Sequence, residues 1–180
     1  MGRNKRDVDT QLKRDELEVA ALQLFTERGY EATSMAMVAA HAGVAPNTLY
    51  WYFKNKDDLL VAALNRQVEA WLTEHAGMAD EPLLTQLHWL INRMRRANNL
   101  VSAVHARVSQ SDVIREWHEQ FHLTLDALVV AQLKASGMSQ KKATLMATVG
   151  THVVEGLLSH PHSAQKTDAV LAWLAGATAR

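Results

Sequence analysis

The sequence of 180 residues contains no cysteine, only three prolines and eight glycines, and no excess of either charge. Without cysteine there is no disulfide, no thiolate metal ligand and no cysteine nucleophile, and the reducing cytoplasm is the expected location. Few prolines and glycines favour long helices, because both residues interrupt them. No apolar run reaches the roughly 18 residues of a membrane span, and no signal peptide is apparent. These absences predict an all-α cytoplasmic protein without a membrane partner.

The charges balance at 19 basic and 19 acidic residues, which argues against a generally basic coat that binds nucleic acid non-specifically. A local excess of positive charge lies in the first 14 residues, which contain five basic and two acidic residues: Arg3, Lys5, Arg6, Lys13 and Arg14 against Asp7 and Asp9. Residues 1 to about 10 show no periodic pattern and predict a mobile arm. Such an arm is either a solvated tail or a contact to phosphates or the minor groove.

Residues 33–60 predict two short helices separated by a turn, followed by the start of a third. Small apolar residues recur at helical spacing in the first helix: Ala36, Val38, Ala39 and Ala42. Gly43 can adopt the left-handed conformation that reverses the chain, and Pro46 suits the first turn of the next helix. Helix, glycine turn and helix also occur in any small bundle, so this geometry alone does not indicate DNA binding.

The outer face of the second helix favours DNA binding. An ordinary solvated face is mostly Lys and Glu, whereas this one offers amide, hydroxyl and aromatic groups before two lysines: Asn47, Thr48, Tyr50, Trp51, Lys54 and Lys56. Such groups can contact base edges or bind phosphates. The segment is therefore interpreted as a helix-turn-helix.

The order of these residues resembles the DNA-binding domain of the TetR family of transcriptional regulators, over roughly residues 15 to 65. The matching pattern is T-S-x-x-x-V-A-x-x-A-G-V-x-x-N-T-L-Y-W-Y-F-x-N-K-D-D-L-L, preceded by F-x-x-x-G-Y-x-x-T from Phe25 to Thr33. Two positions depart from it. Ala45 stands where the family usually has a Ser or Thr cap, a loss of about 1 kcal/mol. Asn47 stands where a small residue is common, which would change the bases contacted.

The resemblance implies that the second helix enters the major groove of an operator in double-stranded DNA. The expected groove contacts are Asn47, Thr48, Tyr50 and Trp51, with Asn47 and Trp51 nearest the bases. The expected phosphate contacts are Ser34, Tyr50, Lys54 and Lys56. Asn47 could alternatively be only a helix-start residue.

Apolar periodicity and helix-end signals predict about nine helices in all. Besides the two short ones, the expected ranges are Lys13–Arg28, Lys56 to about His75, Leu83–Ala97, a short helix near 101–108 after a turn at Asn98 and Asn99, Val113–Ala135, Gln140–Ser159 and Lys166–Ala177. We expect an N-terminal three-helix head that binds DNA (1–60) and a C-terminal helical bundle for ligand binding and dimerisation (61–180). The segment 77–82 is the clearest internal interruption, and the helix from Lys56 is the expected lever between head and body.

The last two predicted helices have more apolar positions than one buried face needs. In the TetR family such helices typically pair across a two-fold axis, and the alternative is that their stripe is internal core. The expected homodimer interface is Val149, Val153, Leu157, Val170, Trp173 and Leu174. A symmetric dimer implies a pseudo-palindromic operator.

Large adaptable side chains in the body form a candidate ligand pocket, although residues of this kind more often form plain core. The candidates are Trp71, His75, Trp89, Met94, His105, Trp117, Phe121 and His122. Family members usually bind an effector, and this residue set favours a small hydrophobic or aromatic compound.

His118 and His122 are four positions apart on one helix and could bind a metal together, but the sequence assigns no third ligand. Exposed or core-edge histidines are the default interpretation, so neither metal nor cofactor is predicted. No nucleophile elbow, glycine-rich phosphate loop or H-E-x-x-H pattern is present, so no catalytic residue is predicted and an enzyme is not expected. The chain is therefore predicted to be a sequence-specific transcriptional regulator, a repressor released from its operator by the effector. The alternatives are an activator or a regulator without effector and, in a different class, a helical metal- or ligand-binding protein or an enzyme.

Overall fold

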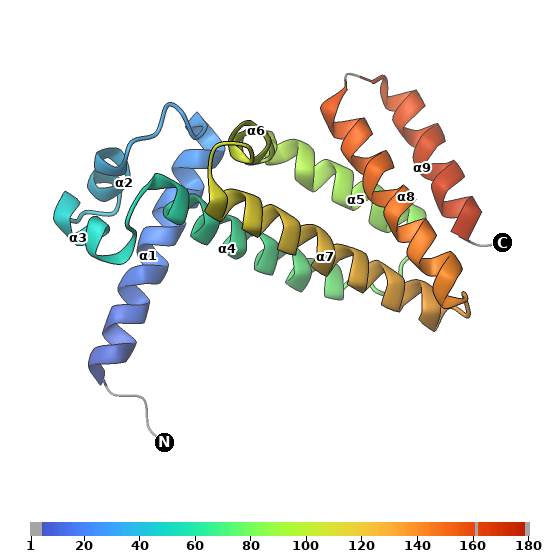
Figure 1. The fold of residues 1–180 in the computed structure, drawn as a ribbon, viewed down its shortest axis with the longest axis horizontal. Coiled ribbons are helices and arrows are strands. Elements are labelled where there is room, and N and C mark those ends of the chain that lie inside the picture. Colours follow the sequence, from blue (N-terminus) through green and yellow to red (C-terminus); the bar gives the residue numbers. More distant parts are fainter. Residues whose placement is uncertain (1–4, 161, 179–180) are drawn as a thin grey trace. The chain divides into compact units, whose positions relative to one another are not determined.

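The computed structural model describes residues 5–160 and 162–178, and the side chains of residues 9–160 and 162–177. Within these ranges the regular structure consists of nine helices and no strand, so the all-α prediction is confirmed (Figure 1). The helices are α1 (Lys5–Arg28), α2 (Met35–His41), α3 (Pro46–Tyr52), α4 (Lys56–Ala76), α5 (Leu83–Arg96), α6 (Asn98–Arg107), α7 (Asp112–Ala135), α8 (Gln140–Ser159) and α9 (Ala164–Thr178). None of the described helices is long and apolar enough to cross a membrane.

Three helix starts differ from the expected ones by two residues or more. α1 begins at Lys5, so the arm predicted for residues 1 to about 10 is wrong from Lys5 onward, and residues 1–4 lie outside the described residues. A solvated polar helix is stabilised by i,i+4 pairs such as Gln11 with Asp15 at 2.8 Å, and apolar periodicity cannot detect it.

The other two starts lie later in the chain. The turn expected at Asn98 and Asn99 is at Ala97, and both asparagines belong to the first turn of α6. α9 starts two residues earlier than expected, because the Ser163 side chain accepts a hydrogen bond from the Lys166 N–H at 3.2 Å and caps the helix.

The helices form two compact units that alternate along the chain. The first unit contains α1 to α4, α6 and the first residues of α7, and the second contains α5, the rest of α7, α8 and α9. The chain passes between units at Gly77, at Ala97 and at Trp117, so the predicted interruption at 77–82 coincides with one passage. The predicted division of function at residue 60 lies inside α4 and stays a prediction.

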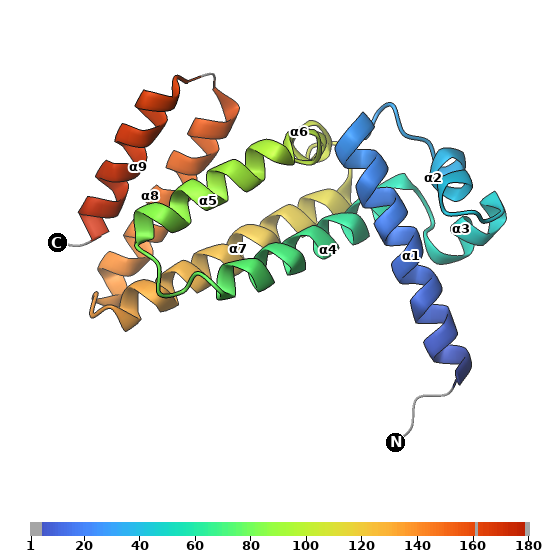
Figure 2. The same ribbon diagram turned by 180° about the vertical axis from the view of Figure 1, so that it is seen from behind.

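The first unit is built on α1, which packs against α2, α4 and α6 (Figure 2). Its large core side chains are almost fully buried: Leu17, Phe25, Leu49, Phe53, Leu59, Leu60 and Leu100. Leu17 and Phe25 lie in the apolar stripe that the sequence places on one side of α1. This core fixes the short helices α2 and α3, which are too short to be stable alone.

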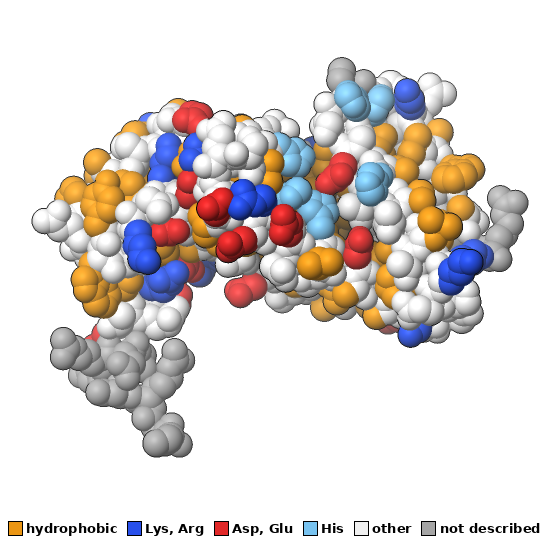
Figure 3. Space-filling model, viewed as in Figure 1, with side chains coloured by type: hydrophobic (Ala, Val, Ile, Leu, Met, Phe, Trp, Pro, Cys, Tyr) orange, Lys and Arg blue, Asp and Glu red, His pale blue; other side chains and the backbone are white. Residues whose placement is uncertain are grey.

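In the second unit, α5 packs against α8 and α9, and α8 also contacts α9. The buried centre consists of Ile91, Val154, Leu157 and Leu171, surrounded by half-buried leucines and valines. Several large apolar side chains of this unit are exposed: Leu123, Leu128, Val129, Leu145 and Trp173. Figure 3 shows hydrophobic side chains on the visible face of α8 and α9.

Candidate nucleic-acid interface and ligand cavity

α2 and α3 are joined by the turn that the sequence predicts at Gly43. Gly43 has φ 67°, a left-handed conformation that glycine adopts without strain. The Gly43 and Val44 N–H groups donate to carbonyls of the last turn of α2, at 3.2 and 3.0 Å, and so end that helix. α3 then begins at Pro46 after Ala45, which makes no side-chain cap, as the sequence indicates.

The outer face of α3 is exposed, while its inner face is anchored. Leu49 is fully buried, whereas Asn47, Tyr50 and Trp51 are exposed and Thr48 is half-buried. Trp51 is 71% exposed although it is the largest side chain of the helix, and its ring packs edge-on against Tyr52 at 4.6 Å between centroids. An exposed, oriented indole beside an amide suits contact with base edges in the major groove.

The segment before α2 offers a second polar group. The Ser34 hydroxyl oxygen accepts a hydrogen bond from the Met37 N–H at 3.2 Å and caps α2, while Ser34 stays exposed. Its own O–H can therefore donate to a phosphate. The neighbouring Thr33 is buried, and its hydroxyl donates to the Gly29 carbonyl at 2.8 Å. Lys54 is exposed directly after α3.

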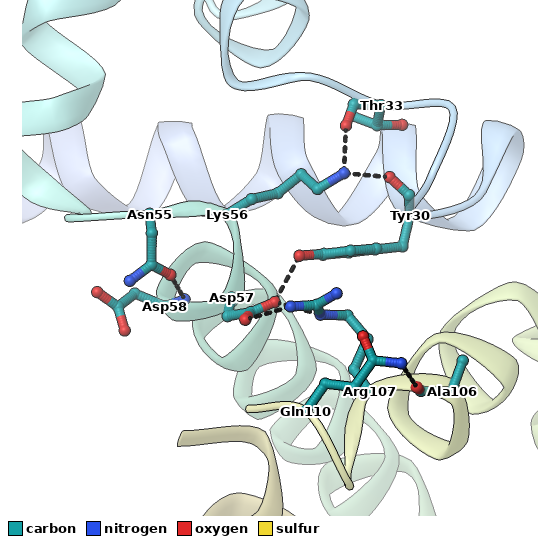
Figure 4. Close-up of polar contacts among 9 residues, drawn as sticks. All are labelled: Tyr30, Thr33, Asn55, Lys56, Asp57, Asp58, Ala106, Arg107 and Gln110. Atoms are coloured by element: carbon teal, nitrogen blue, oxygen red, sulfur yellow. Dashed lines mark hydrogen bonds and ion pairs between the residues drawn. The ribbon is translucent and has the colours of Figure 1, made fainter. Parts of the chain in front are cut away.

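Lys56 has an internal role that the sequence did not indicate. Its ammonium group donates to the Tyr30 and Thr33 carbonyl oxygens at 2.9 and 3.1 Å and lies 3.9 Å from the centroid of the Tyr30 ring (Figure 4). These contacts fix the α1–α2 connection to the start of α4. The phosphate contact of Lys56 stays a prediction, now for a group that also stabilises the fold.

Asp57, in the first turn of α4, lies at the centre of a cluster made from three segments (Figure 4). Arg107, the last residue of α6, binds both carboxylate oxygens, with its Nε at 2.7 Å from Oδ1 and its terminal nitrogen at 2.8 Å from Oδ2. The Tyr30 hydroxyl, at the exit of α1, donates to Oδ1 as well. Bidentate arginine–carboxylate pairs fix orientation as well as distance. Tyr30 and Asp57 both belong to the sequence pattern that resembles the TetR family, but no sequence pattern pointed to Arg107.

The surroundings shift the pKa values of this cluster in opposite directions. Burial raises the pKa of Asp57, but hydrogen bonds from Arg107, Tyr30 and Ser111 outweigh it and hold the pKa below its ordinary value. Burial, and then the hydrogen bond to Asp57, raise the pKa of the Tyr30 phenol far above its ordinary value. At neutral pH the cluster is therefore an ionised carboxylate held by an arginine and a neutral phenol.

The second unit contains a cavity of about 360 Å³ between α5, α7, α8 and α9. Most of its lining is apolar, and the polar lining residues are His122, Gln132, Ser136, Thr151 and Glu155. Of the predicted pocket residues, Met94, Phe121 and His122 line this cavity. Trp89 and Trp117 belong to the same unit outside the lining set, and Trp71, His75 and His105 belong to the first unit.

The six predicted dimer residues do not form one exposed patch. Leu157 and Leu174 are buried inside the second unit, and Val149, Val153 and Val170 are half-buried. Trp173 is 64% exposed on α9. The interface stays a prediction, and Trp173 is the residue most available for it.

Comparison with known proteins finds a family that the N-terminal helices match. Residues 19–63 match the family described as bacterial regulatory proteins, tetR family. Over 80 residues the chain is 39% identical to the HTH-type transcriptional repressor KstR of Mycolicibacterium smegmatis, which covers 43% of this chain and 39% of the relative. Over 49 residues it is 39% identical to the fatty acid metabolism regulator protein of Bacillus subtilis, which covers 27% of this chain and 25% of the relative. These matches thus span about two fifths of the relatives' lengths or less.

Solved structures resemble the chain over nearly its whole length. Salmonella enterica GusR superposes with a TM-score of 0.68 at 22% identity, covering 92% of this chain and 93% of that one. The multidrug binding protein EbrR, complexed with imidazole, superposes with a TM-score of 0.65 at 20% identity, covering 90% and 94%. At such identities the likeness establishes a shared fold.

Proposed function

We propose that the chain, whose N-terminal helices match the tetR family of bacterial regulatory proteins over residues 19–63, is a sequence-specific DNA-binding transcriptional regulator. The observation that supports this most is the outer face of α3. Leu49 anchors the helix while Asn47, Tyr50 and Trp51 point away from the core. A solvated face with no partner would gain nothing from an exposed indole.

In this proposal α3 enters the major groove, with Asn47 and Trp51 at the bases. Ser34, Tyr50, Lys54 and Lys56 bind phosphates and set the position of the helix on the duplex. The operator is pseudo-palindromic, because a two-fold dimer presents two copies of α3. The regulator acts on this operator as a repressor. The curated relative KstR is named as a repressor.

The test compares Asn47→Ala with Lys54→Ala on an operator selected from random DNA and on a scrambled duplex. Asn47→Ala should lose about 1–3 kcal/mol on the operator and little on scrambled DNA, because an amide reads a base edge. Lys54→Ala should weaken both duplexes alike and lower the salt slope by about one. Lys54 is the better lysine to change, since Lys56 also makes two internal hydrogen bonds.

Lys166→Ala is the matched control, because Lys166 is an exposed lysine on α9. It should leave the affinity for both duplexes unchanged. Equal losses on operator and scrambled DNA for Asn47→Ala would contradict the division of roles, and full affinity in all variants would contradict α3 as the DNA-binding element.

The proposal includes a homodimer formed through α8 and α9. Trp173 is exposed on α9, and burying an aromatic side chain of this size is strongly favourable. Trp173→Glu should therefore shift the mass measured by light scattering from two chains to one. Leu12→Glu, which charges an exposed leucine on α1, is the control and should stay dimeric. If Trp173→Glu leaves the mass of the wild-type dimer unchanged, the interface lies elsewhere.

The effector in this proposal is a small hydrophobic or aromatic compound that occupies the cavity of the second unit. Mainly apolar walls with a few polar groups are typical of ligand sites. An effector makes the regulator release DNA only if it binds the arrangement that cannot bind DNA more tightly than the arrangement that can. α6 offers one route besides α4, because the chain joins it at both ends to helices of the second unit and its Arg107 binds Asp57 on α4.

A further inference from the structure

Two histidines and a glutamate lie close together at the cavity of the second unit, and two of the three, His122 and Glu155, line it. His118 and His122 lie four positions apart on α7, and Glu155 comes from α8. The Nε2 atom of His122 lies 3.0 Å from Nε2 of His118 and 3.2 Å from Oε1 of Glu155. A ring nitrogen of His118 and a carboxylate oxygen of Glu155 also lie within 4.8 Å of each other. Three good metal ligands thus meet in one place.

The spacing of these atoms matches a shared ion. Zinc binds imidazole nitrogen and carboxylate oxygen at about 2.0–2.2 Å, which places two ligands of one ion roughly 3.0–3.4 Å apart at ordinary coordination angles. The two short distances, 3.0 and 3.2 Å, fall in that interval. Hydrogen bonds have similar lengths, but one Nε2 atom has either a single hydrogen or a single lone pair to share between two neighbours. A cation satisfies all three groups at once.

We propose that the chain binds one divalent first-row transition-metal ion, represented by Zn²⁺, through His118, His122 and Glu155. Two imidazoles and one carboxylate are the ligand set of metal sites that keep open coordination positions. His122 and Glu155 both line the cavity, so the ion lies at its wall and can bind water or a donor atom of a ligand there.

The packing around the cluster orients its ligands. The Phe121 ring contacts the His122 ring edge-on at 5.6 Å between centroids and stacks on Trp117 at 5.1 Å. In α8, Glu155 follows buried Val154 and precedes buried Leu157 by two positions, which fixes the direction of its side chain. The side chains of His122 and Glu155 are 24% and 36% exposed, so an ion can reach them.

The experiment measures metal binding to the full chain after treatment with a chelator. Co²⁺ is titrated and followed by its visible ligand-field absorption, Zn²⁺ is then added as a competitor, and calorimetry gives the stoichiometry. We expect one ion per chain. His118→Gln, His122→Gln and Glu155→Gln should each weaken binding at least about tenfold, because each removes one ligand from an open three-ligand site.

His88→Gln is the matched control, because His88 also pairs with a carboxylate of the second unit, Asp168 at 2.9 Å. It should bind the ion like the wild type. Zn²⁺ should raise the thermal midpoint of the wild type and of His88→Gln, and leave that of the ligand variants unchanged. Circular dichroism of the metal-free variants checks that each is folded. Glutamine is the replacement at all three positions because it keeps a side chain that can form hydrogen bonds.

Equal binding by the wild type and all three ligand variants would show adventitious sites and overturn the proposal. No saturable binding of Co²⁺ or Zn²⁺ to the wild type would show that the cluster is a hydrogen-bond network only. Neither measurement uses DNA, so failure here leaves the proposed regulatory function standing, and failure of DNA binding leaves the metal site standing.

Discussion

The two units differ in how closely their apolar cores are packed. In the first unit Phe25 and Leu49 are 0% exposed and Phe53 is 2% exposed. In the second unit a smaller buried centre adjoins a cavity of about 360 Å³. Close packing transmits strain and tolerates little change of volume, whereas a cavity leaves room for another molecule. A close-packed first unit suits rigid support of α3, and a cavity in the second unit suits the ligand binding that we propose.

The largest expected contrast comes from removing one apolar side chain from each unit. Phe25→Ala should lower the free energy of unfolding by about 3–5 kcal/mol, because it opens a cavity in a close-packed core. Leu125→Ala, at a wall that already borders a cavity, should cost only about 1–2 kcal/mol. Urea denaturation followed by circular dichroism measures both. Equal losses would mean that the units are packed alike.

A smaller contrast comes from one carboxylate of each unit. Asp57→Asn should lower the free energy of unfolding by about 1–3 kcal/mol, because it breaks a mostly buried bidentate pair with Arg107. Asp168→Asn, which removes the exposed partner of His88, should stay within about 0.5 kcal/mol of the wild type. Chemical denaturation at pH 7 measures the free energy of unfolding of both variants. A larger loss for Asp168→Asn than for Asp57→Asn would mean that the exposed pair contributes more to stability than the mostly buried one.

The Asp57–Arg107 pair makes the stability of the folded chain depend on pH, in a direction that the pKa of Asp57 determines. The pKa of Asp57 is lowered in the folded chain, so its stabilising contribution is complete above the ordinary carboxyl pKa of about 4. It is lost as the pH falls through the lowered value, where the folded carboxylate takes up a proton. Asp57→Asn should therefore lose less stability than the wild type on acidification below about pH 4. Parallel acid curves for the two proteins would contradict the pKa shift.

The smallest expected effect separates the cavity from the helix that borders it. Gly150 and Gly156 both lie inside α8, and alanine at either should stabilise the helix by roughly 0.5–1 kcal/mol. A Cβ atom at Gly150 would lie 4.0 Å from a Leu174 methyl at the cavity wall, whereas at Gly156 it would meet nothing within 4 Å. Only Gly150→Ala should weaken binding of an apolar probe in a fluorescence titration. Weakening by both variants would place the ligand elsewhere.

Sequence patterns were sufficient for the helix-turn-helix and insufficient for contacts between distant segments. Gly43 and Pro46 follow local rules for turns and helix starts, and the structure confirms both. Arg107 lies 50 positions from Asp57, and nothing near either residue marks the pair. Such contacts depend on how whole helices pack, which periodicity does not determine.

The pocket residues illustrate the same limit. Size and flexibility suggested eight residues, of which Met94, Phe121 and His122 line the cavity. Trp71 is equally large and lies on α4 in the other unit. The third candidate metal ligand, Glu155, could not be identified beside His118 and His122, because it comes from a different helix. Composition indicates which side chains suit a pocket, and only the packing decides which of them meet.

The first unit is assembled from two stretches of chain, and this affects its synthesis and its use as a module. α6 and Arg107 are made after α5, a helix of the other unit, so Asp57 must wait for its partner while that helix emerges from the ribosome. A head cut after Ala76, or transplanted there onto another body, would lack α6 and leave the α1 surface that α6 covers open to solvent. Engineered chimaeras that use the first unit should therefore include residues 97–116 as well as residues 1–76. In the sequence, residues 97–116 lie between the two stretches that form the second unit.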